Sequence, residues 1–223
     1  MFSIVIPTYN ERKNIGKLIS RINKICKKYR YEIIVVDDNS PDGTSEVVKK
    51  LNRRTVKVIT RKKRGLTSAI LDGIKKSRYD TICVMDADFS HDPFYIPEMI
   101  DAIKENDIVI GSRYIRGGRT VRWPMTRKAI SYAATASVRP FVRVNDPLSG
   151  YIAFRKKTLK NAYINENAAK ISLEILQKCK YKNIKEIPIV FSNRKKGKSA
   201  FMNMDTAISY IKQMSRIYIG KRL

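Results

Sequence analysis

Apolar runs and amphipathic stretches alternate along the first half of the chain. The run at 33–36, Ile-Ile-Val-Val, is continuous, as in strands buried on both faces of a sheet. From Asn14 to Cys26, apolar residues recur at steps of three and four, which indicates one face of a helix. The same reasoning predicts strands at 2–7, 32–36, 55–60, 81–85 and 107–112. It predicts helices from residue 14, around 47–51, at 67–76 and at 93–105.

Strands that alternate with helices of this length predict βαβ units. They therefore predict an α/β fold with a mainly parallel sheet and helices on both of its faces. Ligands of such sheets bind outside the carboxyl ends of the strands. Polar clusters follow four predicted strands, at Tyr9–Glu11, Asp37–Asp38, Asp86–Asp88 and Ser112–Arg113. Right-handed crossovers put all four clusters at one edge of the sheet, where we expect the site.

The second half of the chain is less regular. It predicts helices at 126–138, 167–180 and 204–219, and strands at 151–154 and 184–191. Pro188 demotes the last of these strands to a sheet edge. In the terminal helix, Ile208, Ile211, Met214 and Tyr218 fall on one face, so this helix is expected to be amphipathic.

The composition is that of a globular protein, with 43% hydrophobic and 30% charged residues in 223. No apolar run approaches the roughly 18 residues of a membrane span. The N-terminus lacks the basic region and cleavage site of a secretory signal. Cys26, Cys83 and Cys179 lie in apolar patterns and form no CxxC pair. We therefore expect reduced core thiols in a cytosolic protein, and no zinc site.

Charge is distributed unevenly along the chain. There are 46 Lys and Arg against 20 Asp and Glu, a formal net charge of +26. Residues 81–112, however, hold seven acidic residues and one lysine. The basic excess predicts attraction to polyanions such as nucleic acid, anionic lipid headgroups or phosphorylated ligands. The lysine-rich composition of heat-adapted proteins is the alternative explanation, but it does not account for an acidic centre.

The acidic centre is densest in the segment "VMDADFSHDP" at 84–93. Asp86 and Asp88 flank one small residue, so in an extended segment their side chains point the same way. Paired carboxylates suit Mg²⁺ or Mn²⁺ that is shared with the phosphates of a substrate. The alternative is an Asp-rich turn that caps the next helix, a role that we assign to Asp92. We expect His91 to be a hydrogen-bonded structural residue.

Two common nucleotide-binding motifs are missing from the sequence. A dinucleotide enzyme would place GxGxxG after the first strand, where residues 7–12 read Pro-Thr-Tyr-Asn-Glu-Arg without a glycine. The P-loop pattern GxxxxGK(S/T) is also absent. The sequence therefore excludes both of these classes.

Taken together, these residues resemble the family 2 inverting glycosyltransferases of the GT-A fold, and among them the polyprenyl-phosphate (dolichyl-phosphate) mannosyltransferases. The resemblance covers nearly the whole chain and rests on an ordered set of motifs. They are "IVIPTYNERKNI" at 4–15, "IIVVDDNSPDGT" at 33–44, "RKKRGLTSAILDGI" at 61–74, "VMDADFSHDPFYIPEMI" at 84–100, "GSRY" at 111–114, "RWPMTRKAIS" at 122–131, "DPLSGY" at 146–151 and "RKKGKS" at 194–199. A lone DxD would be weak, whereas the ordered set is specific.

The resemblance implies one Rossmann-like GT-A domain over 1–223. Residues 1–112 would bind the nucleotide sugar, and 113–223, with the C-terminal amphipathic helix, the acceptor. The implied nucleotide-sugar residues are Pro7, Tyr9, Glu11, Val36, Asp38, Asp86, Ala87, Asp88, Arg113, Arg194 and Lys198. The implied metal ligands are Asp86, Asp88 and Ser90. The implied catalytic residues are Asp88, Arg113 and Arg127, and those for the acceptor phosphate are Arg113, Arg127 and Ser131.

The resemblance also implies the reaction. Mannose would pass from GDP-mannose to a polyprenyl (dolichyl) phosphate with inversion, giving a lipid-linked sugar donor for glycosylation. Glucose from UDP-glucose is the alternative, and the cofactor is Mg²⁺ or Mn²⁺. A phosphate with a second pKa of roughly 6 is already anionic at neutral pH, so no general base is required. The sequence agrees, because no His or Cys arrangement could serve as one.

Some features depart from the family pattern or concern the membrane. Ala200 stands where relatives have a last basic residue, and the loop at 159–171 is short. Some relatives carry C-terminal membrane spans that this chain lacks. We therefore expect a peripheral protein on the cytoplasmic face of the membrane, with the terminal helix and basic surface against the lipid. Packing of that helix against the domain is the alternative, and a small membrane-anchoring partner remains open.

A nucleic-acid-binding protein is the distant alternative, motivated by the net charge of +26. It gives no reason for the acidic residues at 81–112, because a DNA groove would not be lined with seven acids. No nucleic acid is therefore expected as a partner.

Overall fold

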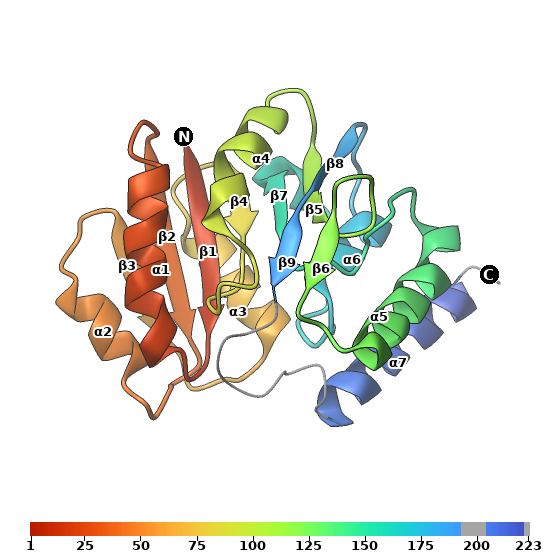
Figure 1. Cartoon of the computed structure of the whole chain (residues 1–223), viewed down its shortest axis with the longest axis horizontal. Helices are drawn as coiled ribbons and strands as arrows, with labels where there is room; N and C mark the ends of the chain where they lie inside the picture. Colours follow the sequence, from red (N-terminus) through yellow and green to blue (C-terminus); the bar gives the residue numbers. More distant parts are fainter. Residues whose placement is uncertain (193–203, 221–223) are drawn as a thin grey trace.

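A computed structural model describes residues 1–192 and 204–220 (Figure 1). Within these residues, a seven-stranded sheet with the order β3-β2-β1-β4-β7-β5-β8 forms the centre of the molecule. Its strands are β1 (Phe2–Thr8), β2 (Tyr31–Asp37), β3 (Val56–Thr60), β4 (Thr81–Val84), β5 (Ile108–Ser112), β7 (Ile152–Arg155) and β8 (Ile184–Pro188). A separate two-stranded sheet pairs β6 (Arg119–Val121) with β9 (Val190–Ser192).

Helices connect the strands and cover the main sheet. They are α1 (Arg12–Ile25), α2 (Thr44–Lys50), α3 (Leu66–Lys76), α4 (Ile96–Ala102), α5 (Met125–Val138), α6 (Ile171–Lys178) and α7 (Met204–Gly220). Three short 3₁₀ helices also occur, η1 (Pro93–Tyr95), η2 (Arg139–Phe141) and η3 (Lys156–Leu159). The strands predicted in the first half of the chain are all present, with ends that differ by at most one residue.

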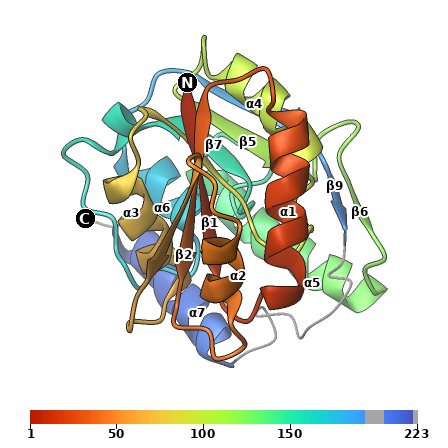
Figure 2. The same ribbon diagram turned by 90° about the vertical axis from the view of Figure 1, so that its left-hand side faces the viewer.

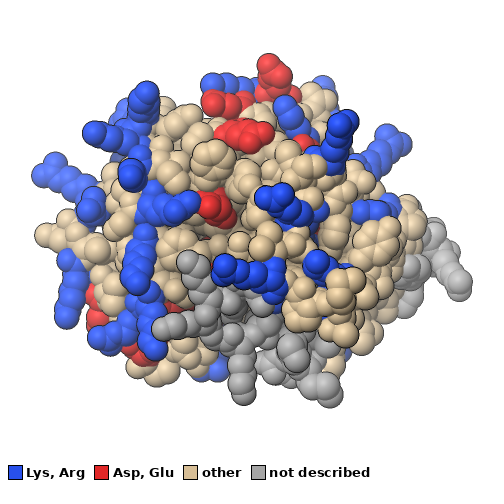
Figure 3. Space-filling view, in the orientation of Figure 1, with Lys and Arg blue, Asp and Glu red and all other residues tan. Residues whose placement is uncertain are grey.

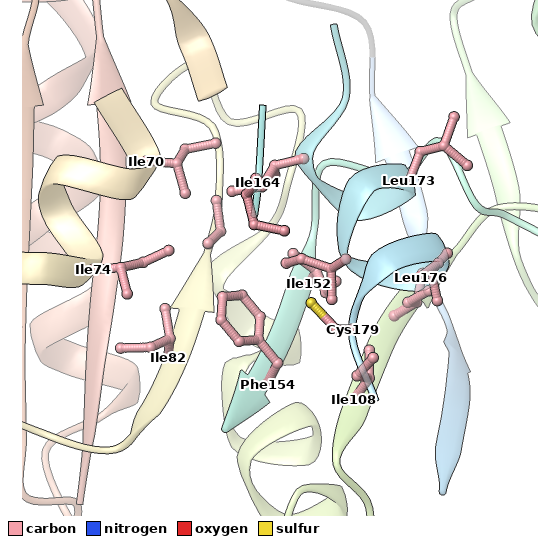
Figure 4. Packing of buried hydrophobic residues seen from close by; sticks show 14 of the residues in the cluster. Ile70, Ile74, Ile82, Ile108, Ile152, Phe154, Ile164, Leu173, Leu176 and Cys179 are labelled. Carbon is pink, nitrogen blue, oxygen red and sulfur yellow. The ribbon is translucent and has the colours of Figure 1, made fainter. Parts of the chain in front are cut away.

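Both faces of the main sheet are buried, because successive side chains of its strands point to opposite faces. Ile4 and Ile6 of β1 belong to a core cluster with α1, α2 and α4, whereas Val5 belongs to a second cluster with α3 and α6. Figure 2 shows α1 and α3 on opposite sides of the strands. In the second cluster, the side chain of Ile70 points from α3 toward β7, and the side chain of Phe154 points from β7 toward α3 (Figure 4). The predicted α/β fold with helices on both faces is confirmed.

The strand directions bring the predicted polar clusters together. β1 pairs in parallel with β2 and with β4, and β2 pairs in parallel with β3. β7 is antiparallel to both β4 and β5, so β4 and β5 point the same way. The carboxyl ends of β1, β2, β4 and β5 therefore lie at one edge of the sheet, as predicted.

Three predicted elements differ from those observed. The helix predicted at 93–105 divides into η1 and α4. The helix predicted at 167–180 is the shorter α6, because the backbone is extended at Lys170 (φ −137°, ψ 111°) and at Cys179 (φ −92°, ψ 149°). The strand predicted at 184–191 is split. β8 pairs with β5 as far as Ser112 and Pro188, at the edge as predicted, and the chain then leaves to pair with β6.

The terminal helix α7 is present as predicted, and the apolar residues of its predicted face divide between the core and the surface. Met214 is buried in the core, whereas Ile208 and Ile211 are 44% and 64% exposed. α7 also packs through Tyr210, whose hydroxyl donates to the carbonyl of Ala134 in α5 (2.9 Å). Tyr218 lies outside the side chains that the structure describes. Among the described helices, none is long and apolar enough to cross a membrane.

The cysteines match the prediction of core thiols. Cys26, Cys83 and Cys179 are buried and form no disulfide. Burial raises the pKa of Cys26 to about 12 and that of Cys179 to about 11, where the latter also feels the charge of Glu174. These thiols are therefore protonated at neutral pH and serve as packing residues.

Candidate active site

Tyr9 and Glu11 lie just after β1, at the predicted nucleoside end of the site. Tyr9 is 39% exposed, and the guanidinium of Arg64 lies 4.2 Å from the centre of its ring. The Glu11 carboxylate accepts from the side chain of Asn14 (2.7 Å), and its backbone N–H donates to the Thr44 hydroxyl (3.0 Å). A partly exposed aromatic ring beside an arginine is suited to a planar base that carries phosphates.

Asp38, at the end of β2, is held in a buried ion pair. Its carboxylate accepts from Nε of Arg61 (2.5 Å), from Nη2 (3.2 Å) and from the backbone N–H of Gly65 (2.9 Å). Val36 is fully buried in the core, so only its backbone lies near the site. Pro7 is its neighbour across the strand pair. The nucleotide-binding roles of these three residues remain predictions.

The paired aspartates lie in a bend that follows β4. Asp86 is about one-third exposed, whereas Asp88 and Ser90 are buried. The backbone N–H of Ser90 donates to Oδ1 of Asp88 (2.9 Å), and Phe89 has a positive φ of 64°. The segment is therefore bent from Ala87 onward, so the extended geometry considered for Asp86 and Asp88 does not apply.

His91 holds this bend in place. Its Nδ1 accepts from the backbone N–H of Asp86 (3.0 Å), and its ring stacks on Tyr151 at 4.9 Å. Burial lowers the pKa of His91, although Asp86 and Asp88 act in the opposite direction. Gly150 leaves room for this packing, since a Cβ there would lie 3.1 Å from Cε1 of His91. His91 thus has the structural role expected of it.

Asp92 caps the next helix, as predicted. Its carboxylate accepts from the backbone N–H of Phe94 (2.9 Å) at the start of η1. The same carboxylate forms an ion pair with Arg21 of α1 (2.9 Å). Of the three clustered aspartates, this one is therefore structural.

The donors at Asp86 and Asp88 fit a hard divalent cation. Carboxylate oxygens are the ligands that Mg²⁺ and Mn²⁺ prefer. Over residues 1–192 and 204–220, no group of three or more His, Cys, Asp or Glu could hold a metal. A cation at these aspartates therefore requires further oxygens, such as those of a diphosphate. Ser90 as a third ligand remains a prediction.

Arg113, directly after β5, is fixed by one buried carboxylate. Nε and Nη2 donate to the two oxygens of Asp146, each at 2.7 Å, and the backbone N–H of Arg113 donates to the same group (2.9 Å). The side chain of Arg113 is 9% exposed and that of Asp146 is 0% exposed. Burial alone would lower the pKa of Arg113, but Asp146 outweighs burial and the pKa is raised. Glu186 of β8 anchors the Asp146 loop by accepting from its backbone N–H (2.9 Å).

Aromatic side chains surround the arginines of the predicted acceptor end. The guanidinium of Arg127 lies 4.1 Å from the ring centre of Trp123, and that of Arg113 lies 5.7 Å away. The indole Nε1 of Trp123 is buried and has no hydrogen-bond partner in the part of the chain described. The Tyr114 hydroxyl donates to the Ser131 hydroxyl (2.8 Å). These contacts hold Arg127 and Ser131 on the same side of the sheet edge as Arg113.

Three residues of this region went unassigned in the sequence analysis. Asp146 and Trp123 lie inside the motifs "DPLSGY" and "RWPMTRKAIS", so the sequence marks their positions as part of the family pattern. It does not indicate which residues they contact. Lys170 carried no motif signal. Its ammonium lies within electrostatic reach of Asp86, Arg113, Asp146 and Arg127.

The structure therefore brings Asp86, Arg113 and Arg127 into one region. Arg194 and Lys198, predicted at the same site, lie outside the described residues. Figure 3 shows many Lys and Arg side chains on the face turned to the viewer, with a few acidic groups that lie apart from one another.

An open α/β sheet with a carboxylate pair and arginines at its carboxyl edge agrees with the class of glycosyltransferase that the sequence motifs resemble. A model of the family described as "Glycosyl transferase family 2" matches residues 3–163. The chain belongs to this family.

Two curated relatives carry the same name. The chain is 43% identical to "Dolichol-phosphate mannosyltransferase" of Pyrococcus furiosus, over 96% of this chain and 63% of the relative. It is 34% identical to "Dolichol-phosphate mannosyltransferase" of Saccharomyces cerevisiae, over 99% of this chain and 88% of the relative. The chain thus spans a little under two thirds of the Pyrococcus relative and most of the yeast one.

Solved structures share the fold. Mannosyl-3-phosphoglycerate synthase from Rubrobacter xylanophilus is 16% identical with a TM-score of 0.72, over 100% of this chain and 76% of that chain. Glucosyl-3-phosphoglycerate synthase from Mycobacterium tuberculosis, in complex with Mn²⁺, UDP and phosphoglyceric acid, is 16% identical with a TM-score of 0.71, over 97% and 78%. At this identity the likeness concerns the fold alone.

Proposed function

We propose that the protein transfers mannose from GDP-mannose to a polyprenyl phosphate, with inversion at the sugar. The proposal depends on one combination. The Asp86–Asp88 bend and the arginines Arg113 and Arg127 share one sheet edge, in a chain 43% identical to a protein named dolichol-phosphate mannosyltransferase. The wording of the "DADFSHDP" motif favours mannose, and glucose from UDP-glucose is the alternative donor.

The donor would lie along the strand ends in the order that the sheet dictates. Tyr9 and Glu11 after β1 would receive the nucleoside, since this is the switch point between β2 and β4. The diphosphate would then reach Asp86 and Asp88 after β4. A divalent cation held by these carboxylates would neutralise charge on the departing diphosphate. The sugar would face Arg113 after β5, on the acceptor side.

The acceptor phosphate would be held by Arg113, Arg127 and Ser131. Arginine suits this role because its planar fork pairs with phosphate oxygens. A phosphate oxygen forms the new bond to the anomeric carbon, while the bond from that carbon to the diphosphate breaks and the electron pair leaves with the diphosphate. The phosphate monoester is anionic at neutral pH, so no side chain has to take up its proton. Catalysis then consists of positioning and charge stabilisation.

The first experiment is a transfer assay with farnesyl phosphate, Mg²⁺ or Mn²⁺, and labelled GDP-mannose or UDP-glucose in parallel. We expect label in the lipid from GDP-mannose and none after EDTA treatment. Asp88→Asn should lower the rate by roughly 100-fold or more. Asp92→Asn is the matched control on the same loop and should keep the rate. Transfer from UDP-glucose alone would replace the donor, and no transfer from either would overturn the proposal.

The membrane surface is a further partner that we propose, because the acceptor is a lipid. Ile211 of α7 is 64% exposed and Ile130 of α5 is 60% exposed. Ile130 lies one turn before Ala134, whose backbone carbonyl accepts from Tyr210 of α7, so the two exposed isoleucines lie on neighbouring helices. Lys212 and Arg216 add two cations on α7 and border a cavity of about 280 Å³. Apolar and basic side chains on one helix suit an anionic bilayer surface.

Vesicle sedimentation tests this surface. The protein should sediment with vesicles of anionic phospholipid and less so with neutral ones, and added salt should weaken binding. Ile211→Ser should weaken binding several-fold, whereas Lys160→Ser, an exposed basic residue of another region, should have little effect. Equal binding by both variants would contradict the proposed face. The cytoplasmic leaflet and a small membrane-anchoring partner belong to the same proposal and require cellular localisation and co-purification.

A further inference from the structure

Lys170 lies at the junction between the predicted donor and acceptor ends of the site. It immediately precedes α6, and its side chain is partly exposed. Two residues further on, the Ser172 hydroxyl donates to the carbonyl of Pro147 (2.9 Å), the residue after Asp146. Two residues before, the carbonyl of Ala168 accepts from the Thr67 hydroxyl at the start of α3 (2.7 Å). The segment is therefore tied to the loop that fixes Arg113 and to the other side of the sheet edge.

The backbone of Lys170 is held by a residue of the terminal helix. The Gln213 side-chain oxygen accepts from the N–H of Lys170 (3.1 Å), and its amide nitrogen donates to the C=O of the same residue (3.0 Å). The amide nitrogen also lies 3.3 Å from an oxygen of Glu174. Gln213 is 2% exposed and Glu174 is 3% exposed. Both polar groups of one peptide unit are thus fixed by one buried side chain, which limits the positions open to the Lys170 side chain.

The charges that act on Lys170 are those of the proposed phosphate site. Arg113 and Arg127 are the nearby cations, and Asp86 and Asp146 are the nearby carboxylates. Asp146 is engaged by Arg113 on both of its oxygens. Asp86 is a proposed ligand of the metal. A group of three neighbouring cations favours an anion of high charge, and a phosphate monoester carries about −1.5 to −2 at pH 7.

We infer that Lys170 is a third cation for the phosphate of the lipid acceptor, beside Arg113 and Arg127, and that Gln213 of α7 positions it. The inference rests on the proposed function, because it assigns a residue to the acceptor of that reaction. It adds a link between the helix proposed to face the membrane and the site where the lipid phosphate reacts. Lysine would act as a point charge next to the planar forks of the arginines.

The single tryptophan provides a direct binding assay. Trp123 lies 4.1 Å from the Arg127 guanidinium, so an anion at this site should change its fluorescence. Wild type, Lys170→Met and Lys170→Arg are titrated with farnesyl phosphate, with inorganic phosphate, and separately with GDP and Mn²⁺. We expect Lys170→Met to weaken binding of both phosphates about tenfold, since a charge-assisted bond is lost. Lys170→Arg should stay within about threefold of wild type, and GDP affinity within about twofold.

Each other outcome overturns the inference. Unchanged phosphate affinity in Lys170→Met would remove Lys170 from the site. Equal weakening of farnesyl phosphate and GDP would indicate a general structural role. If Lys170→Met weakens the binding of farnesyl phosphate but not that of inorganic phosphate, Lys170 contacts the prenyl chain and not the phosphate. If wild type fails to transfer sugar in the assay described above, the proposed function fails; if it transfers sugar and Lys170→Met binds normally, only this inference fails.

Gln213→Leu tests the positioning role separately from the charge. It should raise the KM for farnesyl phosphate about threefold with little change in kcat or in GDP affinity, because Lys170 remains but is held less firmly. Gln177→Leu on α6 is the matched control, since it removes the same amide away from this contact. A fall in kcat with KM unchanged, or an equal effect of both variants, would contradict the role of Gln213. Urea midpoints of all variants exclude loss of folding as the cause.

Discussion

Two buried arginine–aspartate pairs lie at the carboxyl edge of the sheet. They differ in how many nitrogens of the arginine bond to the protein. All three side-chain nitrogens of Arg61 bond to the protein, to Asp38, Asp72, Ser68 and a backbone carbonyl. Nε and Nη2 of Arg113 bond to Asp146, while Nη1 bonds to none of the residues described. All nitrogens of the Arg61 guanidinium therefore bond at the β2 end, whereas one nitrogen of Arg113 is left for the acceptor phosphate that we propose.

Their surroundings differ in the same sense. Arg61 lies among hydrogen-bonding groups, and Asp72 is about two-fifths exposed. Arg113 lies among rings, with its guanidinium 5.1, 5.5 and 5.7 Å from the centres of Tyr114, Phe191 and Trp123. Aromatic rings exclude water and form no hydrogen bonds with the N–H donors of the arginine. They therefore strengthen the electrostatic attraction between the arginine and a bound phosphate. The proposed donor side is thus closed by hydrogen bonds, whereas aromatic rings surround the arginine of the proposed acceptor side.

Asp146→Asn should give the largest effect, because it breaks the pair that has no second carboxylate. Arg113 would remain buried with its charge unbalanced, at a cost of about 3 kcal/mol in the free energy of unfolding. Transfer activity should also fall, since Arg113 loses its fixed orientation. Urea unfolding and the transfer assay measure the two effects. A loss below about 1 kcal/mol would show that other groups balance Arg113.

Asp38→Asn should cost less, about 2 kcal/mol, because Arg61 keeps its contact with Asp72 (3.0 Å). The variant also tests the donor side, where GDP affinity should fall while binding of farnesyl phosphate is unchanged. Comparison of Asp146→Asn and Asp38→Asn in one urea series measures how much the Asp72 carboxylate contributes to the free energy of unfolding. An equal or larger loss in Asp38→Asn would reverse the comparison.

The placement of residues on the proposed donor side could be predicted from the sequence better than the placement of those on the proposed acceptor side. Asp38, Asp86 and Asp88 directly follow continuous apolar strands, so parallel topology alone brings them to one edge. Asp146 and Lys170 lie in irregular segments, and their partners are set by contacts over long stretches of chain. The buried position of Gln213 in α7 could not be predicted for the same reason, because apolar periodicity does not register a polar side chain that bonds to a backbone.

Trp123→Leu should act on the acceptor side alone. It removes the ring on which Arg127 lies, and a partly desolvated cation–π contact of about 1.4 kcal/mol corresponds to a tenfold change in affinity. The KM for farnesyl phosphate should rise roughly tenfold, with kcat and GDP affinity nearly unchanged. Trp123→Phe should recover most of the loss. Steady-state kinetics with each substrate varied in turn make the measurement, and an equal rise in both KM values would contradict the separation of the two sides.

Glu32→Gln should have the smallest effect. Glu32 belongs to the half of the chain proposed to bind the donor, but it lies at the start of β2, away from the carboxyl edge. Its carboxylate is buried and accepts from the Ser3 hydroxyl (2.8 Å), the Lys57 ammonium (3.0 Å) and the backbone N–H of Arg78. Burial raises the pKa of Glu32, but these bonds outweigh burial and the pKa lies below its usual value.

A lowered pKa in the folded state means that the ionised group stabilises the fold above the unfolded pKa of about 4.3. This contribution is lost as the pH falls through the folded pKa. Glu32→Gln should therefore be less stable than wild type by about 1 kcal/mol at pH 7, and the difference should shrink below pH 4 or so. Transfer activity should not change, because Glu32 lies away from the carboxyl edge. Urea midpoints from pH 3 to pH 7 test this, and a difference independent of pH would show that packing, and not charge, sets the contribution of Glu32.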